Sequence, residues 1–490
     1  MPPGIATVVF AVIIGGLYFL DREKKPAGTS PALWIAVTWV FIGASRMVSQ
    51  WLRLEAPDAA EAYIEGSPLD RNLLAILIIL GVLVLIARGR LTAAVLKANA
   101  PILLFFGYCA ASVLWSDFPF VALKRWTKAA GNLTMVLLVL TDPQPAAAVK
   151  RLFAWTGFLL IPLSVLLVKY YPNMGRGYFS WSWETFFVGV ATDKNGLGAL
   201  CMLFGLAAFW RFVHLYRERT GSDGVGPLVA QGALLVMAFW LFTKAESATS
   251  TVCFTLGALL ILFTIREKNR QPARLHAIMA TLVCFGLLGY TFPELYGLVL
   301  DALGRDRSLT GRTDIWADVF NVEFNPLVGT GFESFWLGSR LDYLWAKYSF
   351  HPNQAHNGYI ETYLNLGWIG VGLLAILLVS GYRNVIKTFR HGAALGSLGL
   401  PFFLVAVSYN FTEAAFKVMN PVWIAFLLAI ASTPPPLLAG DETATRVDPH
   451  VRRLTARPRA TTDSHRGRAP RRIRTLTGVP PAASNDLPVE

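Results

Sequence analysis

Long apolar stretches separated by short polar segments run along almost the whole chain. A transmembrane helix needs about 20 predominantly apolar residues to cross the roughly 30 Å hydrocarbon core of a bilayer. The pattern therefore predicts an all-α integral membrane bundle. Because several stretches are shorter than 20 residues, we expect 12 or 13 transmembrane helices. The stretches are residues 4–20, 32–45, 72–87, 100–114, 129–141, 152–168, 195–210, 227–242, 251–265, 276–292, 358–380, 396–411 and 421–433.

The composition supports a membrane protein and excludes an ordinary soluble one. Of the 490 residues, 54% are hydrophobic and 15% are charged, whereas a soluble chain carries about a quarter charged residues. The four cysteines all lie within apolar stretches, so we expect small packing residues rather than disulfide partners or zinc ligands. They are Cys109, Cys201, Cys253 and Cys284.

The net charge of +13 comes in large part from the end of the chain, where ten arginines lie between Arg446 and Arg474. This region follows three consecutive prolines, at 434–436, and has no apolar periodicity. We therefore expect a disordered tail that is attracted to anionic membrane lipids rather than to nucleic acid.

Lysine and arginine also divide the connecting segments into two alternating sets. The basic set and the tail are predicted to be cytoplasmic by the positive-inside rule, which makes the other set periplasmic in a multi-pass protein of the cell inner membrane. The predicted divisions are membrane spans 1–71 and 72–292, one large periplasmic loop 293–357, membrane spans 358–432 and the basic cytoplasmic tail 433–490.

The predicted periplasmic segments hold the unusual motifs of this sequence. These are G-R-T-D-I-W at 311–316, N-P-L-V-G-T-G at 325–331, H-N at 356–357, G-W-I-G at 367–370 and F-T-E at 411–413. Their joint order and placement resemble the O-antigen ligase/polymerase family, over roughly residues 70–432. Two further motifs, W-S-D at 115–117 and T-D-K-N-G-L-G at 192–198, resemble its exopolysaccharide-polymerase branch.

This resemblance implies a glycosyltransferase that works at the periplasmic face. The donor would be an undecaprenyl-diphosphate-linked saccharide, and the acceptor another glycan end or lipid A-core. The family implies no metal, cofactor or nucleotide sugar. Motif 192–198 favours a polymerase of surface polysaccharide slightly over a lipid A-core O-antigen ligase, and a protein O-glycosylation ligase is a third possibility.

A transporter that flips lipid-linked oligosaccharide is the alternative from another class. It would need charged residues within the bundle, since intramembrane charges are costly and usually functional. The central parts of the apolar stretches are almost free of charge, which favours an enzyme at the outer face.

A diphosphate leaving group needs positive charge near the membrane surface, and the planar guanidinium of arginine suits phosphate oxygens. The alternative for each such cation is an ion pair with an acidic residue in the same loops, such as Asp117, Asp193 or Asp314. The candidate diphosphate ligands are Arg312, Arg125, Lys194, Arg176 and Arg305.

His356 is the candidate general base, because imidazole accepts a proton near neutral pH. Its alternative is a structural hydrogen bond at the start of a helix. Glu413 is expected to orient His356 or to bind a sugar hydroxyl. Its alternative is an ion pair with Lys417, one helical turn later. Trp316 and Tyr359 are the candidate sugar-contacting rings, although aromatic belts are routine at membrane interfaces.

Overall fold

The computed structural model describes residues 1–22, 28–54, 66–178, 184–218, 224–266, 271, 273–281, 312–390 and 394–433. All of them belong to one compact unit, Met1–Glu442. Arg305, Cys284 and residues 434–490 of the predicted tail lie outside the described residues.

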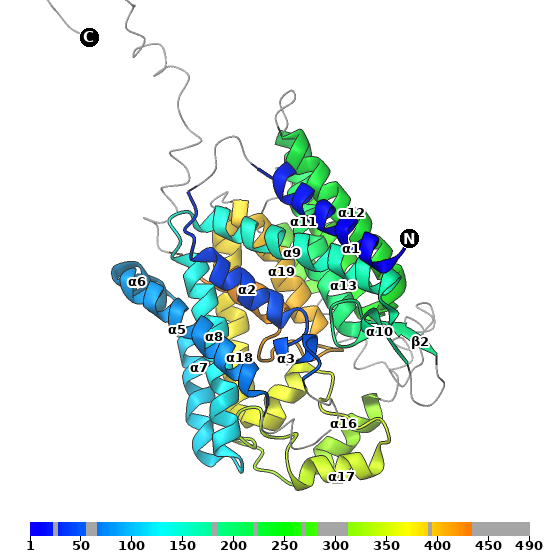
Figure 1. Ribbon diagram of the computed structural model, residues 1–490. Helices are drawn as coiled ribbons and strands as arrows, with labels where there is room; N and C mark the ends of the chain where they lie inside the picture. Colours follow the sequence, from blue (N-terminus) through cyan, green and yellow to red (C-terminus); the bar gives the residue numbers. More distant parts are fainter. Residues whose placement is uncertain are drawn as a thin grey trace, which may run out of the picture. The chain divides into compact units, whose positions relative to one another are not determined.

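The described chain is predominantly helical, with one short hairpin, which confirms the predicted all-α membrane fold (Figure 1). Its first half comprises α1 (Pro3–Leu20), α2 (Leu33–Gly43), α3 (Val48–Trp51), α5 (Pro68–Ala87), α6 (Gly89–Ala98), α7 (Ala100–Ala111), the 3-10 turn η1 (Ser112–Trp115), α8 (Pro119–Leu140), α9 (Pro145–Tyr170), α10 (Pro172–Gly175), and the antiparallel hairpin β1 (Arg176–Tyr178) and β2 (Thr185–Phe187). Its second half comprises α11 (Lys194–Glu218), α12 (Val225–Ala245), α13 (Ala248–Thr264), α16 (Arg312–Asn321), α17 (Ser339–Lys347), α18 (Gly358–Arg390), α19 (Ala394–Tyr409) and α20 (Pro421–Ile430).

Within the described residues, six helices are long and apolar enough to cross a membrane: α1, α5, α9, α11, α12 and α18. A seventh candidate is the pair α6 and α7, which is bent by 87° at its junction. Shorter apolar helices, α2, α13, α19 and α20, match four more of the predicted stretches. Most of stretch 276–292 lies outside the described residues, and the number of spans stays a prediction.

Two helices begin earlier than the apolar pattern predicted. α8 begins at Pro119, so Arg125, which falls between the predicted stretches 100–114 and 129–141, lies on a helix. α9 begins at Pro145 rather than near residue 152. Proline is favoured in the first helical turn, and lysine and arginine are good helix formers, so each helix extends beyond its apolar part.

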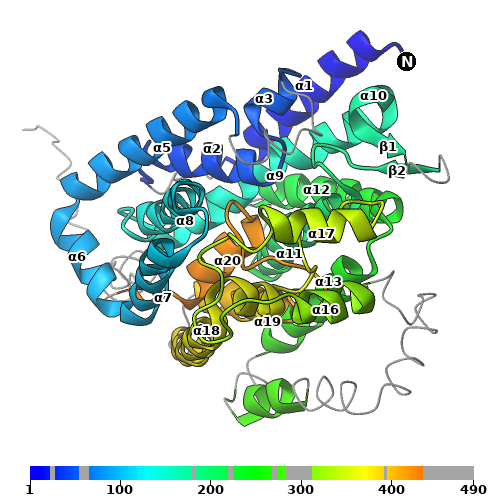
Figure 2. The same ribbon diagram turned by 90° about the horizontal axis from the view of Figure 1, so that it is seen from below.

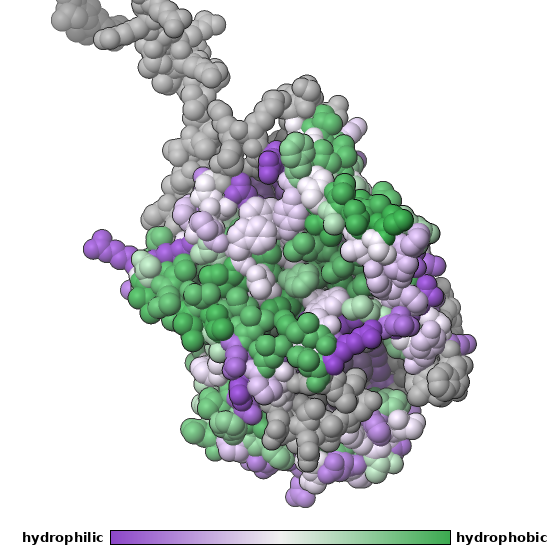
Figure 3. Space-filling view, viewed as in Figure 1, coloured by the Kyte–Doolittle hydropathy of each residue, from purple (hydrophilic) through white to green (hydrophobic). Residues whose placement is uncertain are grey.

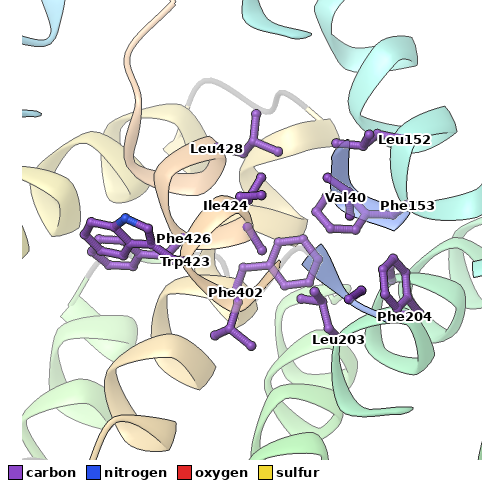
Figure 4. Close-up of a cluster of buried hydrophobic side chains, with 14 of the residues drawn as sticks. Val40, Leu152, Phe153, Leu203, Phe204, Phe402, Trp423, Ile424, Phe426 and Leu428 are labelled. Carbon is purple, nitrogen blue, oxygen red and sulfur yellow. The ribbon is translucent and has the colours of Figure 1, made fainter. Parts of the chain in front are cut away.

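The helices pack around a shared apolar core (Figure 4). Phe402 of α19 and Phe426 of α20 lie in it, together with Phe204 of α11 and Phe153 of α9. Every residue of α20 from Pro421 to Leu428 is buried, as expected for a helix that is apolar all round. Cys109, Cys201 and Cys253 are buried free thiols, in keeping with a packing role.

The opposite pattern marks the surface that would face lipid. Figure 3 shows hydrophobic residues gathered over α5 and over α1 and α12. On α5 these include Ile79, Leu83 and Ile86, which are exposed although they are large and apolar. Water disfavours so wide an apolar surface, whereas hydrocarbon tails accommodate it.

Residues 312–357 form an ordered cap beyond the start of α18, with α16 and α17 as its helices (Figures 1 and 2). The cap has a small core of its own, in which Ile315, Phe335 and Leu344 are almost fully buried. Leu364 of α18 belongs to the same core, so the cap packs directly against that helix.

The G-W-I-G motif breaks α18, and the N-P-L-V-G-T-G motif fills the break. Gly367 has φ 63°, which interrupts the helix. Thr330 and Gly331 donate their backbone N–H groups to the carbonyls of Leu364 and Asn365, at 3.1 and 2.9 Å. Backbone groups freed inside a membrane protein must find such partners, so the two motifs form one structural unit.

Candidate active site

The start of α18 is hydrogen-bonded to the loop between α19 and α20. The backbone N–H of Gly358 donates to the carbonyls of Asn410 and Glu413, at 2.9 and 3.1 Å. A side chain at position 358 would collide with Asn410, because its Cβ would lie 1.9 Å from Oδ1. The amide of Asn357 adds a further bond to the same loop. This packing brings Glu413 beside His356.

Glu413 connects the two other side chains that the sequence singled out for chemistry. Its Oε1 accepts a hydrogen bond from Nη2 of Arg312 at 2.7 Å, and its Oε2 lies 3.2 Å from Nδ1 of His356. Arg312 is the first residue of α16, His356 precedes α18, and Glu413 lies between α19 and α20. We call these three residues the charged triad.

The triad opens toward solvent at its histidine. The side chains of Glu413, Arg312 and His356 are 8%, 16% and 27% exposed, respectively. Glu413 is thus shielded by its two partners, and His356 is the member that a substrate reaches most easily.

The carboxylate of Glu413 is held in its charged form. Burial by itself would raise its pKa, but the hydrogen bond with His356 and the positive charge of Arg312 outweigh burial and keep the pKa below its ordinary value. A charged carboxylate can only accept hydrogen bonds. We therefore assign the proton of neutral His356 to Nδ1, which leaves Nε2 free to accept another proton.

The backbone of His356 is fixed from both sides. Its φ of 50° lies in the left-handed region, where a non-glycine residue is strained and needs support from its surroundings. On one side, the indole N–H of Trp316 donates to the carbonyl of Ala355 at 2.7 Å. On the other, Oδ1 of Asn357 caps α18 by accepting from the N–H of Tyr359 at 3.0 Å. Such supported strain is common at functional sites.

Glu361 is a second, partly buried carboxylate next to this loop, and the sequence reasoning missed it. It accepts hydrogen bonds from the indole of Trp336 at 2.9 Å and from the backbone N–H of Ala355 at 2.5 Å. Asn365, one turn later, donates to it at 3.3 Å. The sequence did offer a signal for Glu361, which is a glutamate and an asparagine four residues apart within an apolar run. Residues with this spacing lie on the same face of a helix, and polar groups inside a membrane usually have a function.

The remaining predicted cations have other described partners. Arg125 donates to the carbonyl of Glu333, within the cap. Arg176 donates to the carbonyl of Val168 at 3.1 Å and packs over the ring of Phe187, so its described contacts are with α9 and the hairpin.

Lys194 is the first residue of α11. Gly198 of the same motif packs against Ser247, where a Cβ would approach to 2.5 Å. Two residues after Ser247, Thr249 shares a hydrogen bond of 2.9 Å with Thr412, the neighbour of Glu413. Helix α13 therefore contacts both the start of α11 and the loop between α19 and α20 that carries Glu413, which we call the triad loop.

The two candidate sugar-contacting rings have structural tasks in this arrangement. Trp316 uses its N–H to hold Ala355. Tyr359 packs against Phe411 and Phe416, with ring centroids 4.9 and 5.6 Å away, and its hydroxyl donates to the carbonyl of Val407. These contacts favour a packing role for Tyr359, and sugar contact by either ring stays a prediction.

Comparison with known sequences agrees with the motif order. Residues 231–375 match the sequence model of the O-antigen ligase family. This part of the chain is therefore similar to the O-antigen ligase domain. The match includes Arg312 and His356, whereas Glu413 comes from beyond it. The resemblance expected from the sequence is thereby confirmed.

The similarity to individual proteins covers more of the chain than residues 231–375. The chain is 27% identical over 290 residues to the exopolysaccharide production protein ExoQ of Rhizobium meliloti, covering 56% of this chain and 62% of that protein, which is less than two thirds of its length. It is 22% identical over 348 residues to a protein of Rickettsia prowazekii that is provisionally named a polysaccharide ligase, covering 68% of this chain and 80% of that protein. A Rickettsia typhi protein with the same provisional name matches to the same extent.

Proposed function

We propose that the protein is a membrane glycosyltransferase that acts at the periplasmic face in the synthesis of surface polysaccharide. Its donor is an undecaprenyl-diphosphate-linked saccharide, and it transfers the saccharide to a glycan end or to lipid A-core. The observation that carries the proposal is the charged triad, in which Glu413 holds Arg312 and His356 together. The similarity to the O-antigen ligase domain supports the same class of reaction.

His356 acts as the general base of this reaction. The acceptor hydroxyl oxygen forms a bond to the anomeric carbon of the donor while the bond between that carbon and the diphosphate oxygen breaks. The hydroxyl proton passes to Nε2 of His356, and undecaprenyl diphosphate leaves with the electron pair of the broken bond. Direct displacement of this kind inverts the anomeric centre. The charge of Glu413 stabilises the imidazolium that forms.

Arg312 neutralises the diphosphate. Glu413 engages its Nη2, and a guanidinium has five N–H donors in a planar fork, so the others are available for phosphate oxygens. The ion pair with Glu413 thus holds Arg312 in place while its remaining donors bind the leaving group. Lys194 is the next candidate ligand, because α13 links its helix to the triad loop.

A polymerase is slightly favoured over a ligase. The relative from Rhizobium meliloti is named for exopolysaccharide production, whereas the two Rickettsia relatives are named as polysaccharide ligases. Motif 192–198, at the start of α11, carries the preference for a polymerase.

One assay separates the two activities. Purified protein is incubated with undecaprenyl-diphosphate-linked repeat units alone and then with lipid A-core added. A ladder of products without lipid A-core supports a polymerase, and transfer only after its addition supports a ligase. Absence of transfer to any glycan acceptor would contradict the proposed function.

The predicted topology has its own test. The cap would lie in the periplasm, and Ser339 begins α17 within it. A cysteine introduced by Ser339→Cys should react with a membrane-impermeant thiol reagent in cells whose outer membrane alone is permeable. Labelling only after the inner membrane is opened would place the cap in the cytoplasm and contradict the proposed face.

A further inference from the structure

The far end of α18 carries a pocket that the transfer reaction does not use. It is lined by Tyr382, Arg383, Ile386, Lys387 and Arg390 of α18 and by His276 of the helical segment 273–281, and it has a volume of about 450 Å³. The hydroxyl of Tyr382 and Nδ1 of His276 are 2.7 Å apart, which joins the two sides. Known ligand pockets have volumes of about 300–1,000 Å³, so this one is large enough for a small ligand.

The pocket and the charged triad lie at opposite ends of one membrane helix. His356 comes just before α18, and the pocket begins at Tyr382. The part of α18 after its break, residues 368–390, is about 34 Å long at 1.5 Å per residue. That length crosses the roughly 30 Å hydrocarbon core, so the pocket faces the membrane surface opposite the triad.

The charges around the pocket select an anion. Arg383, Lys387 and Arg390 are spaced four and three residues apart, which puts them on one face of α18. Of the six lining residues, all in the described part of the chain, none is acidic. The C-terminal end of a helix bears roughly half a negative charge, and three cations exceed it several-fold.

The same helix face also indicates which anion. Going back along α18 from Arg383, the positions four and seven residues earlier are Val379 and Ile376, which are 54% and 51% exposed. One continuous face therefore changes from exposed apolar side chains to cations at the end of the span. A molecule with a phosphate at one end and hydrocarbon chains at the other matches that order.

We infer that this pocket binds the phosphate headgroup of an anionic membrane lipid, with its acyl chains along Ile376 and Val379. Arg383, Lys387 and Arg390 contact the phosphate, and the bond between His276 and Tyr382 closes the pocket on its other side. Bound lipid fixes the depth of α18 in the bilayer, at the end opposite the triad.

The test titrates the full-length protein in nonionic detergent with dioleoyl phosphatidylglycerol and measures bound lipid by native mass spectrometry. The pocket variant is Arg383→Gln/Arg390→Gln. The control is Arg90→Gln/Lys97→Gln, which removes two exposed charges from α6. Each basic residue near an anionic lipid changes binding roughly fivefold, so the pocket variant should bind about thirtyfold more weakly. The control should stay within about threefold of the wild type, because Arg90 and Lys97 belong to α6 and do not line the pocket.

Further arms distinguish charge from folding and lipid from soluble phosphate. Arg383→Lys/Arg390→Lys keeps the charges and should retain most of the affinity. Dioleoyl phosphatidylcholine should bind weakly to every variant. The inference is overturned if the pocket variant binds phosphatidylglycerol like the wild type, or if the lysine variant loses as much affinity as the glutamine variant. Glycerol 1-phosphate that binds as tightly as the lipid would overturn the assignment to a lipid.

Discussion

Removing the charge of Glu413 while keeping its shape is the sharpest perturbation of the charged triad. The Glu413→Gln side chain can still accept a hydrogen bond from Arg312, but it no longer attracts either partner as an ion. The wild-type carboxylate is 8% exposed and makes two polar contacts, at 2.7 and 3.2 Å. Hydrogen bonds to charged groups are worth about 1.5–3 kcal/mol each, so both interactions weaken substantially.

Turnover should suffer more than donor binding. A misoriented base loses most of its effect on the step in which the sugar–oxygen bond forms, which typically corresponds to about a hundred- to ten-thousandfold. Arg312 remains present and can still donate a hydrogen bond to the amide oxygen at position 413, so its remaining donors stay available to the diphosphate. We therefore expect kcat to fall in this range while donor affinity stays within about threefold of the wild type.

The assay measures kcat and donor affinity in nanodiscs for protein with a verified melting temperature. The matched control is Asp318→Asn, which removes a paired carboxylate from the cap. Asp318 lies 2.6 Å from Lys347 and accepts a hydrogen bond from the hydroxyl of Tyr348. This control should lower stability and leave kcat per folded molecule unchanged. Equal kcat for Glu413→Gln and the wild type would refute the catalytic reading of the triad and leave Glu413 a structural residue.

The other predictions concern pH, the broken helix and the partly buried carboxylate of Glu361. Because the pKa of Glu413 is held below its ordinary value of about 4.5, its charge is present at higher pH and lost only as the pH falls through the lowered pKa. A kcat profile from pH 5 to 9 should therefore show no loss from its protonation, and a loss in this range that Glu413→Gln abolishes would contradict the pKa shift. Gly367→Ala should lower the melting temperature strongly, since φ is 63° and a Cβ would lie 2.3 Å from the backbone of Leu327, whereas Gly372→Ala meets nothing within 4 Å and should be tolerated. Glu361→Ala should cost about 1–3 kcal/mol of stability for each donor left unpaired, measured by denaturation, and an unchanged melting temperature would contradict the contacts described.

The membrane fold could be predicted from the sequence because a bilayer allows few alternatives. An apolar run in hydrocarbon must form a helix to satisfy its own backbone, so α1, α5 and α18 follow directly from the pattern. The residues at which helices begin were harder to predict from the sequence. The part of α8 from Pro119 to Lys128 carries three basic residues among apolar ones, and hydrophobicity alone does not distinguish it from a loop.

The members of the candidate site were predicted from the sequence, and so was one of the two alternatives for Glu413, its contact with His356; the contact between Arg312 and Glu413 was not predicted. Arg312, His356 and Glu413 were each singled out, and an ion pair between an arginine and a loop carboxylate was expected with other partners, such as Asp314. Sequence spacing could not reveal that Glu413, 101 residues after Arg312, would be that partner. The contact depends on the packing of Gly358 against Asn410, which no local pattern encodes.

The central claim is that Arg312 binds the leaving diphosphate while His356 removes the proton of the acceptor. Lipid-diphosphate affinity and kcat, measured side by side for Arg312→Ala, Arg312→Lys and His356→Ala in nanodiscs, test it most directly. We expect Arg312→Ala to lose affinity and kcat, Arg312→Lys to restore them only in part because lysine lacks the planar fork, and His356→Ala to lose about a hundred- to ten-thousandfold in kcat with nearly unchanged affinity. Wild-type kcat for His356→Ala from pH 6 to 9, or a loss of affinity as large as that of Arg312→Ala, would contradict the account.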